Sequence, residues 1–320
     1  MKTALVGDIG GTNARFALWR DQCLEQIRVL RTAEHASPEL AILAYLGEID
    51  QPLETIDAVC LACAGPVSGD SFRFTNNHWR LSRKAFCQAL GLSELLLIND
   101  FAAMALGMTR LRENERITVC AGEPEPGRPR LVIGPGTGLG VAGLLPLKGG
   151  GWRALPGEGG HVCLPVGSER EAAIWAHLHA ALGHVNAEAV LSGPGLLALY
   201  RTCCALDGRE ASLDSPAGIT AAALAGDPYA VDVLQQFCRW LGRIAGDSVL
   251  TLGARGGVYI AGGMVPRFAE FFLRSDFTRS LRDKGRMSAY FDGLPVWLVT
   301  AAYPGLEGAG VALQALREDT

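Results

Sequence analysis

Short apolar runs bounded by Gly, Pro and Asn recur along the chain and predict strands. The clearest run is 95–98, four apolar residues that are too few for a helix and suit a parallel strand buried on both faces. The other predicted strands are 3–7, 14–19, 26–32, 58–64, 71–74, 130–134, 139–145, 256–261 and 295–299.

Helical periodicity and capping residues predict helices between these strands. Ser37 and Pro38 suit the first two positions of one helix, and Ser168 with Glu171 forms a capping box at the start of another. The predicted helices are 38–49, 82–91, 101–106, 168–182, 196–206, 228–252 and 304–317, the last packing back on the first part of the chain. This alternation predicts an α/β fold.

Two hairpins with similar Gly/Thr turns begin the two halves of the chain, on either side of a predicted linker at 123–129. The first turn is Asp8–Asn13 and the second is Pro135–Gly138. Glycine lets backbone N–H groups approach an anion closely, and Asp8 can hold a hydrated cation. Either turn alone is also typical of an ordinary hairpin. Their repetition favours two half-sites that clamp a polyphosphate.

Asn99 and Asp100 directly follow the predicted strand 95–98 and precede the helix 101–106. In open α/β sheets, ligands bind at the carboxyl ends of strands. An acid at this position can meet a substrate hydroxyl. Alternatively, Asp100 only caps the helix that follows it. This stretch alone leaves both interpretations open.

Glu158 lies between two glycines, which leaves its backbone free to adopt unusual dihedral angles, and His161 follows three residues later. A carboxylate and an imidazole together can bind sugar hydroxyls, although a polar surface turn is the alternative. Two such residues are too few for a metal site. Glu188 lies near the start of a helical segment, where the helix dipole favours a carboxylate and competes with a ligand role. Gly262-Gly263 after a strand admits a flat base or ribose, or is a simple strand–helix turn.

Composition limits the possible functions. A chain of 320 residues suggests two domains, and 49% hydrophobic residues with 40 Gly fit a globular α/β protein. A net charge of −4 without any Lys/Arg block argues against nucleic acid as a ligand, and no apolar run is long enough to span a membrane. Residues 1–4 run directly into a strand, which leaves no room for a signal peptide and predicts a cytosolic protein.

The nine cysteines are scattered, and their number is odd. Cys60 and Cys63 match a C-x-x-C pattern, but they lie in the predicted strand 58–64. Residues three apart on a strand point to opposite faces, so this pair is predicted to be buried and inert rather than a metal or disulfide site.

Together these segments resemble the bacterial ATP-dependent glucokinases, within the superfamily of sugar kinases, actin and heat-shock ATPases. The matching segments are Gly7–Arg15, Leu97–Phe101, Gly136–Gly140, Leu155–His161, Leu191–Gly195 and Gly262-Gly263. A Walker A loop is absent, so a P-loop kinase is not expected. The Cys-rich zinc motif of the related repressor/open-reading-frame/kinase family is also missing after His161, where only Cys163 is nearby. His78, in the stretch 76–79, has no assigned role.

The resemblance implies two actin-like (ribonuclease H-like) α/β domains, each a mixed sheet flanked by helices, with the active site in the cleft between them. It places a small domain at 1–110, completed by the C-terminal helix 301–320, and a large domain at 111–300. Family members are usually cytosolic homodimers.

The resemblance also implies a reaction, in which ATP with Mg²⁺ phosphorylates the 6-hydroxyl of D-glucose to give glucose 6-phosphate and ADP. Asp100 would be the general base. Asn99, Asp100, Glu158, His161 and Glu188 would bind the sugar hydroxyls. The first phosphate loop would consist of Gly7, Asp8, Ile9, Gly10, Gly11, Thr12 and Asn13, with Asp8 near Mg²⁺. The second phosphate loop would consist of Gly136, Thr137 and Gly138. Gly262 and Gly263 would lie against the adenosine. A kinase for mannose, fructose or an N-acetylhexosamine, and a non-catalytic sugar-responsive regulator, are the alternatives.

Overall fold

The computed structural model describes residues 3–65, 67, 69–74 and 77–318, so positions 1–2 of the N-terminal stretch and Asn76 beside His78 lie outside the described residues. The chain divides into two compact units. Unit 1 comprises Met1–Arg112, Trp152–Pro156 and Ala301–Thr320, and unit 2 comprises Glu113–Gly151 and Gly157–Thr300. The segment 123–129 lies inside unit 2.

Unit 1 contains a five-stranded mixed sheet with the order β3-β2-β1-β4-β7, and a separate pair β5-β6. Its strands are β1 (Thr3–Ile9), β2 (Asn13–Arg20), β3 (Cys23–Arg31), β4 (Ile56–Cys63), β5 (Ser71–Arg73), β6 (Arg80–Ser82) and β7 (Glu94–Asn99). Its helices are α1 (Pro38–Glu48), α2 (Arg83–Leu90), α3 (Asp100–Gly107) and α10 (Pro304–Glu318). β1 is antiparallel to β2 and parallel to β4, which is parallel to β7.

Strand β7 confirms the predicted parallel pairing but not the predicted burial on both faces. It is the last strand of its sheet, and Leu97 is its one fully buried residue. Leu95, Leu96 and Ile98 are only partly buried. The sheet ends at β7, so the helices that cover it leave these side chains partly accessible. The carboxyl end of β7 runs directly into α3.

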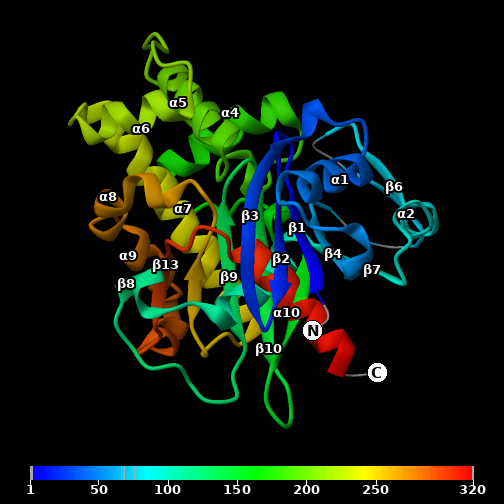
Figure 1. The fold of residues 1–320 in the computed structure, drawn as a ribbon. Helices are drawn as coiled ribbons and strands as arrows, with labels where there is room; N and C mark the ends of the chain where they lie inside the picture. The colour runs from blue at the N-terminus through cyan, green and yellow to red at the C-terminus, as the bar shows by residue number, and fades with distance from the viewer. Residues whose placement is uncertain (1–2, 66, 68, 75–76, 319–320) are drawn as a thin grey trace. The chain divides into compact units, whose positions relative to one another are not determined.

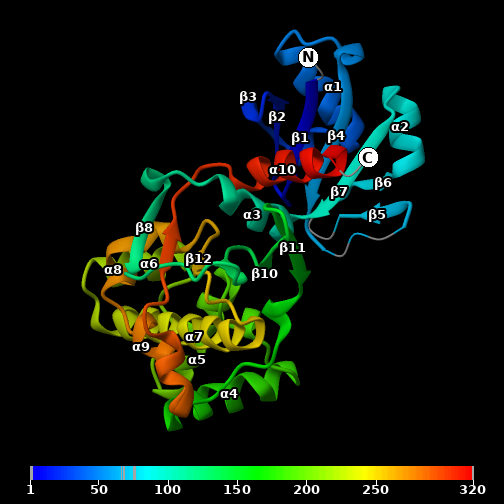
Figure 2. The same ribbon diagram turned by 90° about the horizontal axis from the view of Figure 1, so that it is seen from below.

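Helix α10 packs against α3 and the strands of unit 1. It runs across β1 and β2 in Figure 1 and lies next to α3 in Figure 2. Leu306, Ala309 and Leu313 are fully buried in a cluster with side chains of β1 and β2. The two helices cross very closely, because a Cβ added at Gly308 would lie 1.6 Å from the carbonyl oxygen of Ala103. Glycine is therefore required at this crossing, which fixes α3 and the residues at its start.

Cys60 and Cys63 confirm the prediction of buried thiols on opposite faces of a strand. Both are fully buried in β4, and they belong to different hydrophobic clusters, Cys60 with Ala4 and Leu306 and Cys63 with Phe16. Burial raises the pKa of both thiols, which keeps them protonated and unreactive.

Unit 2 is built on a six-stranded mixed sheet with the order β11-β10-β9-β12-β13-β8. The strands of this sheet are β8 (Arg116–Cys120), β9 (Arg130–Pro135), β10 (Leu139–Pro146), β11 (Trp152–Gly157), β12 (Val258–Ile260) and β13 (Val296–Val299). All but residues 152–156 of β11 belong to unit 2. Its helices are α4 (Glu169–Leu182), α5 (Gly193–Leu206), α6 (Pro216–Leu224), α7 (Pro228–Leu252), α8 (Ala269–Leu273) and α9 (Phe277–Arg282). Short 3₁₀ helices include η5 (Gly159–His161) and η6 (Ala187–Ala189).

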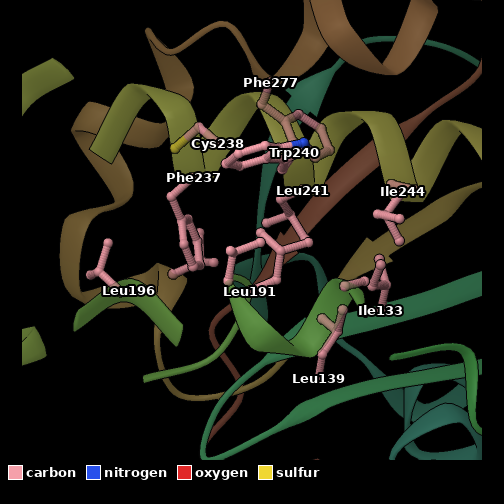
Figure 3. Packing of buried hydrophobic residues seen from close by; sticks show 14 of the residues in the cluster. Ile133, Leu139, Leu191, Leu196, Phe237, Cys238, Trp240, Leu241, Ile244 and Phe277 are labelled. Atoms are coloured by element: carbon pink, nitrogen blue, oxygen red, sulfur yellow. The ribbon is translucent and has the colours of Figure 1, made fainter. Parts of the chain in front are cut away.

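The long helix α7 forms the centre of the core of unit 2. Its side chains Phe237, Leu241 and Ile244 are buried and point toward residues of the sheet and of the segment before α5 (Figure 3). Ile133 of β9 and Leu191 belong to the same cluster. The apolar stripe of α7 is therefore a core face, and it holds in place the strands that carry the second Gly/Thr turn.

The two large sheets share one arrangement over five strands. Each sheet contains a two-stranded hairpin, β1-β2 or β9-β10. The first strand of the hairpin also pairs in parallel with a strand that comes later in the chain, β4 or β12. The orders β3-β2-β1-β4-β7 and β11-β10-β9-β12-β13 correspond strand by strand. The hairpin turns at 10–12 and 136–138 therefore occupy equivalent positions, each beside the end of a parallel strand.

Candidate active site

The first hairpin turn, between β1 and β2, is held by hydrogen bonds to its carbonyl oxygens. Thr32 donates twice, from its backbone N–H to the oxygen of Thr12 (3.0 Å) and from Oγ1 to that of Gly11 (2.8 Å). Nδ2 of Asn77 donates to the oxygen of Gly10 (3.1 Å). These bonds fix the peptide planes of the turn, and fixed peptide planes also fix the directions of the N–H groups. A rigid Gly-Gly turn of this kind suits an anion.

Asp8, at the side of the first turn, is partly buried in β1. Nη1 of Arg15 donates to its Oδ2 (3.2 Å). Burial raises the pKa of Asp8, and the charge and hydrogen bond of Arg15 lower it in part. A Cβ added at Gly305, in the first turn of α10, would lie 3.3 Å from Cγ of Asp8. The carboxylate therefore lies against a helix N-terminus, which favours negative charge.

Two of the residues predicted at the first phosphate loop serve the core of unit 1. A Cβ added at Gly7 would lie 2.7 Å from Cδ2 of Leu61, so glycine is needed there for packing. Ile9 is buried in the hydrophobic cluster of unit 1. Thr12, in contrast, is exposed, and Asn13 begins β2 with a partly buried side chain. Gly7 and Ile9 could thus contribute to a ligand only through their backbone.

Asn99 and Asp100 lie where the sequence predicts, at the junction of β7 and α3. Asn99 is the N-cap, since its Oδ1 accepts from the N–H groups of Phe101 (3.0 Å) and Ala102 (2.9 Å). Its Nδ2 donates to the carbonyl oxygen of Gly65 (3.3 Å). Asp100 is the first residue of α3, and its Oδ1 accepts from the N–H of Phe101 (2.8 Å). The cap is therefore Asn99, and the helix N-terminus favours an ionised Asp100.

The second turn, between β9 and β10, is held by the segment that leads into α5. The N–H of Gly193 donates to the carbonyl oxygen of Gly136 (2.8 Å), and the N–H of Leu139 donates to Oε2 of Glu188 (2.7 Å). A Cβ added at Gly138 would lie 2.4 Å from the same Oε2. The carboxylate of Glu188 therefore lies directly on the turn, in which Thr137 is exposed.

Gly262 and Gly263 lie beside the second turn. Gly262 has φ +82°, and a Cβ there would lie 2.7 Å from the carbonyl oxygen of Pro135, so glycine is required on both counts. A Cβ added at Gly263 would meet nothing within 4 Å. Gly262 therefore packs closely against the second turn, whereas the space beside Gly263 is open. An open space of this kind is needed for a flat ring to approach the backbone.

Glu158 and His161 lie on an exposed segment after β11. Glu158 has φ −107° and ψ 45°, which lie in neither the helical nor the extended region. Glycine is also needed at position 160, where a Cβ would lie 2.1 Å from the carbonyl oxygen of Leu139. The 3₁₀ helix η5 therefore packs directly on β10, and the side chains of Glu158 and His161 remain exposed.

Asn186, which the sequence alone does not single out as a site residue, brings His161 to the helix that carries Glu188. Its Nδ2 lies 3.0 Å from Nδ1 of His161. The adjacent backbones are also joined, since the N–H of Ala187 donates to the carbonyl oxygen of Val162 (2.9 Å). An Asn just before a short helix is a signal for an N-cap, but it does not reveal the contact with His161.

The predicted sugar ligands fall into two groups. Asn99 and Asp100 belong to unit 1, whereas Glu158, His161 and Glu188 belong to unit 2, where the contacts of Asn186 link the segments that carry them. Within the part of the chain that the structure describes, no three His, Cys, Asp or Glu side chains are grouped as metal ligands. Over those same residues, no helix combines the length and the apolar character needed to cross a bilayer.

A cavity of about 320 Å³ in unit 2 is lined by none of these residues. Most of its charged groups pair with one another or with neighbours. Arg170 contacts Asp207 (2.6 Å), the hydroxyl of Tyr229 donates to the same carboxylate (2.8 Å), and Arg239 contacts Asp276 (2.9 Å). These charges satisfy one another, and the cavity carries no separate sign of a ligand.

Comparisons with known proteins agree on one family. A family model described as Glucokinase matches residues 5–316. The glucokinase of Pseudomonas aeruginosa strain LESB58 is 57% identical over 311 residues, which cover 97% of this chain and 94% of that protein. The crystal structure of a glucokinase from an Antarctic psychrotroph is similar with a TM-score of 0.87 and 36% identity, covering 98% of this chain and 99% of that one.

A more distant solved structure shares the fold. The ROK family glucokinase from Streptomyces griseus, in complex with glucose and AMPPNP, has a TM-score of 0.62 at 20% identity and covers 97% of this chain and 98% of its own. This similarity shows the fold alone. The mixed sheets flanked by helices therefore confirm the predicted α/β architecture.

Proposed function

The chain belongs to the glucokinase family, and from this premise we infer that it is an ATP-dependent hexose kinase that phosphorylates glucose. The single observation that carries the catalytic assignment is the junction of β7 and α3. There, Asp100 follows the carboxyl end of a parallel strand and begins a helix, while Asn99 takes the role of the cap. We propose Asp100 as the general base for the 6-hydroxyl of D-glucose.

The chemistry requires such a base. The pKa of a sugar hydroxyl lies far above 7, so a positioned carboxylate has to accept its proton as the bond to phosphorus forms. The start of α3 favours the ionised form of Asp100, which is the form that can accept a proton. Asn99, held between Gly65 and the N–H groups of α3, fixes the direction in which the helix leaves the strand.

In the same proposal, Glu158 and His161 contribute exposed polar groups to the sugar hydroxyls. Glu188 contributes a carboxylate that also accepts from the N–H of Leu139. The first turn, with Gly10, Gly11 and Thr12, and the second, with Gly136–Gly138, bind the phosphates of ATP. Gly262 and Gly263 lie against the adenosine, as the open side of Gly263 allows.

We propose that Mg²⁺ accompanies ATP and that Asp8 holds it through its water ligands. The partly buried carboxylate beside the first turn fits this role, because carboxylate oxygen is a ligand that Mg²⁺ prefers. When bound, the ion neutralises charge on the transferred phosphoryl group. The resemblance further supports a cytosolic homodimer. It also supports one domain at 1–110 plus 301–320 and a second at 111–300. Light scattering would test the dimer, and limited proteolysis would test the domain bounds.

Replacement of Asp100 by Asn tests the base. Asp100→Asn keeps the size of the side chain but not its basicity, so kcat should fall by about 10²–10⁴-fold while glucose still stabilises the protein thermally. Asp21→Asn is the matched control, because Asp21 is exposed and has φ +47°, a conformation that Asn also adopts.

The measurements are a coupled assay with glucose, mannose, fructose and N-acetylglucosamine, and a thermal shift with glucose. If Asp100→Asn turns over glucose at the wild-type rate, another group is the base. If the wild-type enzyme prefers another sugar in the panel, the assignment of glucose is wrong whatever the variant does.

A further inference from the structure

Asn186 makes two hydrogen bonds from one side-chain amide, and together they carry an inference about His161. Oδ1 of Asn186 faces the backbone N–H of Ala189 (2.9 Å), at the start of η6. Nδ2 faces Nδ1 of His161 (3.0 Å). The first contact determines which amide atom of Asn186 is the oxygen and which is the nitrogen. This assignment in turn determines the tautomer of the His161 imidazole.

The backbone N–H of Ala189 fixes the orientation of the Asn186 amide. A peptide N–H can only donate, so the atom that faces it must be the carbonyl oxygen of the side chain. Reversing the amide would place an NH₂ group against the N–H of Ala189 and remove the N-cap of η6. The group that faces His161 is therefore the NH₂ of Asn186.

The NH₂ group can only donate, so Nδ1 of His161 must accept. A neutral imidazole carries a single hydrogen, on one nitrogen or the other. With Nδ1 acting as the acceptor, the hydrogen is on Nε2. The contact is therefore compatible with one neutral tautomer of His161, the Nε2–H form, and not with the Nδ1–H form.

We propose that Asn186 is a positioning residue that fixes His161 as the Nε2–H tautomer, so that the exposed imidazole offers a donor to an oxygen of the bound sugar. The second half of this statement rests on the proposed role of His161 in the sugar site. The first half rests only on the contacts of Asn186. The backbone bond from Ala187 to Val162 keeps the two segments together and so maintains the contact.

Two variants separate the tautomer from the helix cap. Asn186→Ser keeps a good N-cap, but its hydroxyl is occupied by Ala189 and is too short to reach His161 as well. Asn186→Asp keeps the cap and places a carboxylate oxygen opposite Nδ1, where only an N–H can be accommodated. Both variants should unfold near the wild-type temperature, which a thermal scan checks before the comparison.

The tautomer is measured directly by two-bond ¹H–¹⁵N correlation on protein labelled with ¹⁵N-histidine. The chain has six histidines, and the signals missing from His161→Gln identify the ring. Spectra are recorded at rising pH until they no longer change, so that they report the tautomer of the neutral ring. Wild type should show Nε2–H, Asn186→Ser a mixture of both forms, and Asn186→Asp the Nδ1–H form.

Kinetics then test the link to the sugar. In Asn186→Asp the KM for glucose should rise about 5- to 20-fold, the effect of losing one well-placed hydrogen bond. Asn186→Ser keeps part of the Nε2–H form, so its KM for glucose should rise by less, and the KM for ATP should stay unchanged in both variants. An Nδ1–H tautomer in wild type, or an unchanged Nε2–H tautomer in Asn186→Asp, overturns the proposal. The expected tautomers with an unchanged KM for glucose uphold the role of Asn186 and contradict the proposed sugar contact of His161.

Discussion

The two Gly/Thr turns occupy equivalent positions in their sheets, but an acid plays a different part in each. The turn in unit 1 has its carbonyl oxygens held by neutral donors from Thr32 and Asn77, and the strand before it carries its own acid, Asp8. The turn in unit 2 has no acid of its own. One of its N–H groups, that of Leu139, is held by the carboxylate of Glu188, which comes from a segment about 50 residues later in the chain.

This difference separates two turns that occupy equivalent positions in their sheets. In the proposed site, the first turn would keep its acid beside the phosphates, where it would serve a cation. The second turn shares an acid with the proposed sugar ligands, so a displacement of Glu188 would disturb the nucleotide turn and the sugar ligands of unit 2 together. We therefore expect changes at the second turn that displace Glu188 to affect both substrates, and changes at the first turn to affect the nucleotide alone.

The largest effect is expected from Gly138→Ala. The added Cβ would lie 2.4 Å from Oε2 of Glu188, so the carboxylate has to move to make room for it. A displacement on the order of an ångström at an active site can cost about 10²-fold in kcat/KM. Steady-state kinetics should show a higher KM for both glucose and ATP.

Gly136→Ala is the comparison within the same turn, since a Cβ there meets nothing within 4 Å. We expect its defect to be smaller and confined to the KM for ATP. Equal effects of the two variants on glucose would show that Glu188 does not couple the turn to the sugar.

A smaller, pH-dependent effect is expected at the first turn. Arg15 lowers the pKa of Asp8, whereas burial raises it, so Arg15→Gln raises this pKa further. A larger fraction of the carboxyl is then protonated at a given acidic pH, and kcat/KM for MgATP should begin to fall at a higher pH than in wild type. Because the pKa of Asp8 in the folded state is raised, its protonated form adds stability at low pH, which is lost as the pH rises through that pKa.

The measurement is a pH–rate profile at saturating glucose. Arg28→Gln is the control, since Arg28 is exposed on β3 and donates to the carbonyl oxygen of Ile27. Superimposable profiles for Arg15→Gln and wild type would remove Asp8 from the nucleotide site.

The smallest expected effect is a difference in the reactivity of the cysteine thiols, which is measured on the unmodified sequence. Among the described residues, each unit has one exposed cysteine, Cys23 in unit 1 and Cys163 in unit 2. Both should react quickly with a thiol reagent, whereas Cys203, whose pKa burial raises to about 11, should react slowly until the protein unfolds. Glucose should protect Cys163, two residues from His161, but not Cys23. Mass spectrometry of the labelled peptides checks this, and equal protection at both sites would contradict it.

The sequence predicts the local features of this fold well. The caps at Ser37 and Ser82, the hairpins and the strand that ends at Asn99 depend on residues close together in the chain. Contacts between distant segments were missed. The capping box at Ser168 is an example. Its Ser caps α4 as predicted, and the carboxylate of Glu171 reaches back to the backbone N–H of Gly167 (2.6 Å), but the same carboxylate is buried and also accepts from Gln236 of α7, which the sequence does not reveal.

The candidate site shows the same division. The positions of Asp8, Asn99 and Asp100 follow from strands and turns that can be read locally. The link between Asn186 and His161 spans 25 residues, and that between Glu188 and Leu139 spans 49. Neither pair leaves a local signal, because only the packing of unit 2 brings the segments together. His78 is similar, since its ring bonds the distant carbonyl oxygen of His35 (3.0 Å).

The close crossing of α10 with α3 has a consequence for the newly made chain. A ribosome delivers β1 early and α10 about 300 residues later, yet Leu306 and Leu313 complete the cluster that Ala4 and Val6 begin. Unit 2 contains a hydrophobic core of its own, to which α10 contributes no buried residue. Asp8 and α3 gain their last neighbours only when Gly305 and Gly308 arrive. A chain that stops before these residues therefore lacks the packing that holds Asp8 and the start of α3 in place.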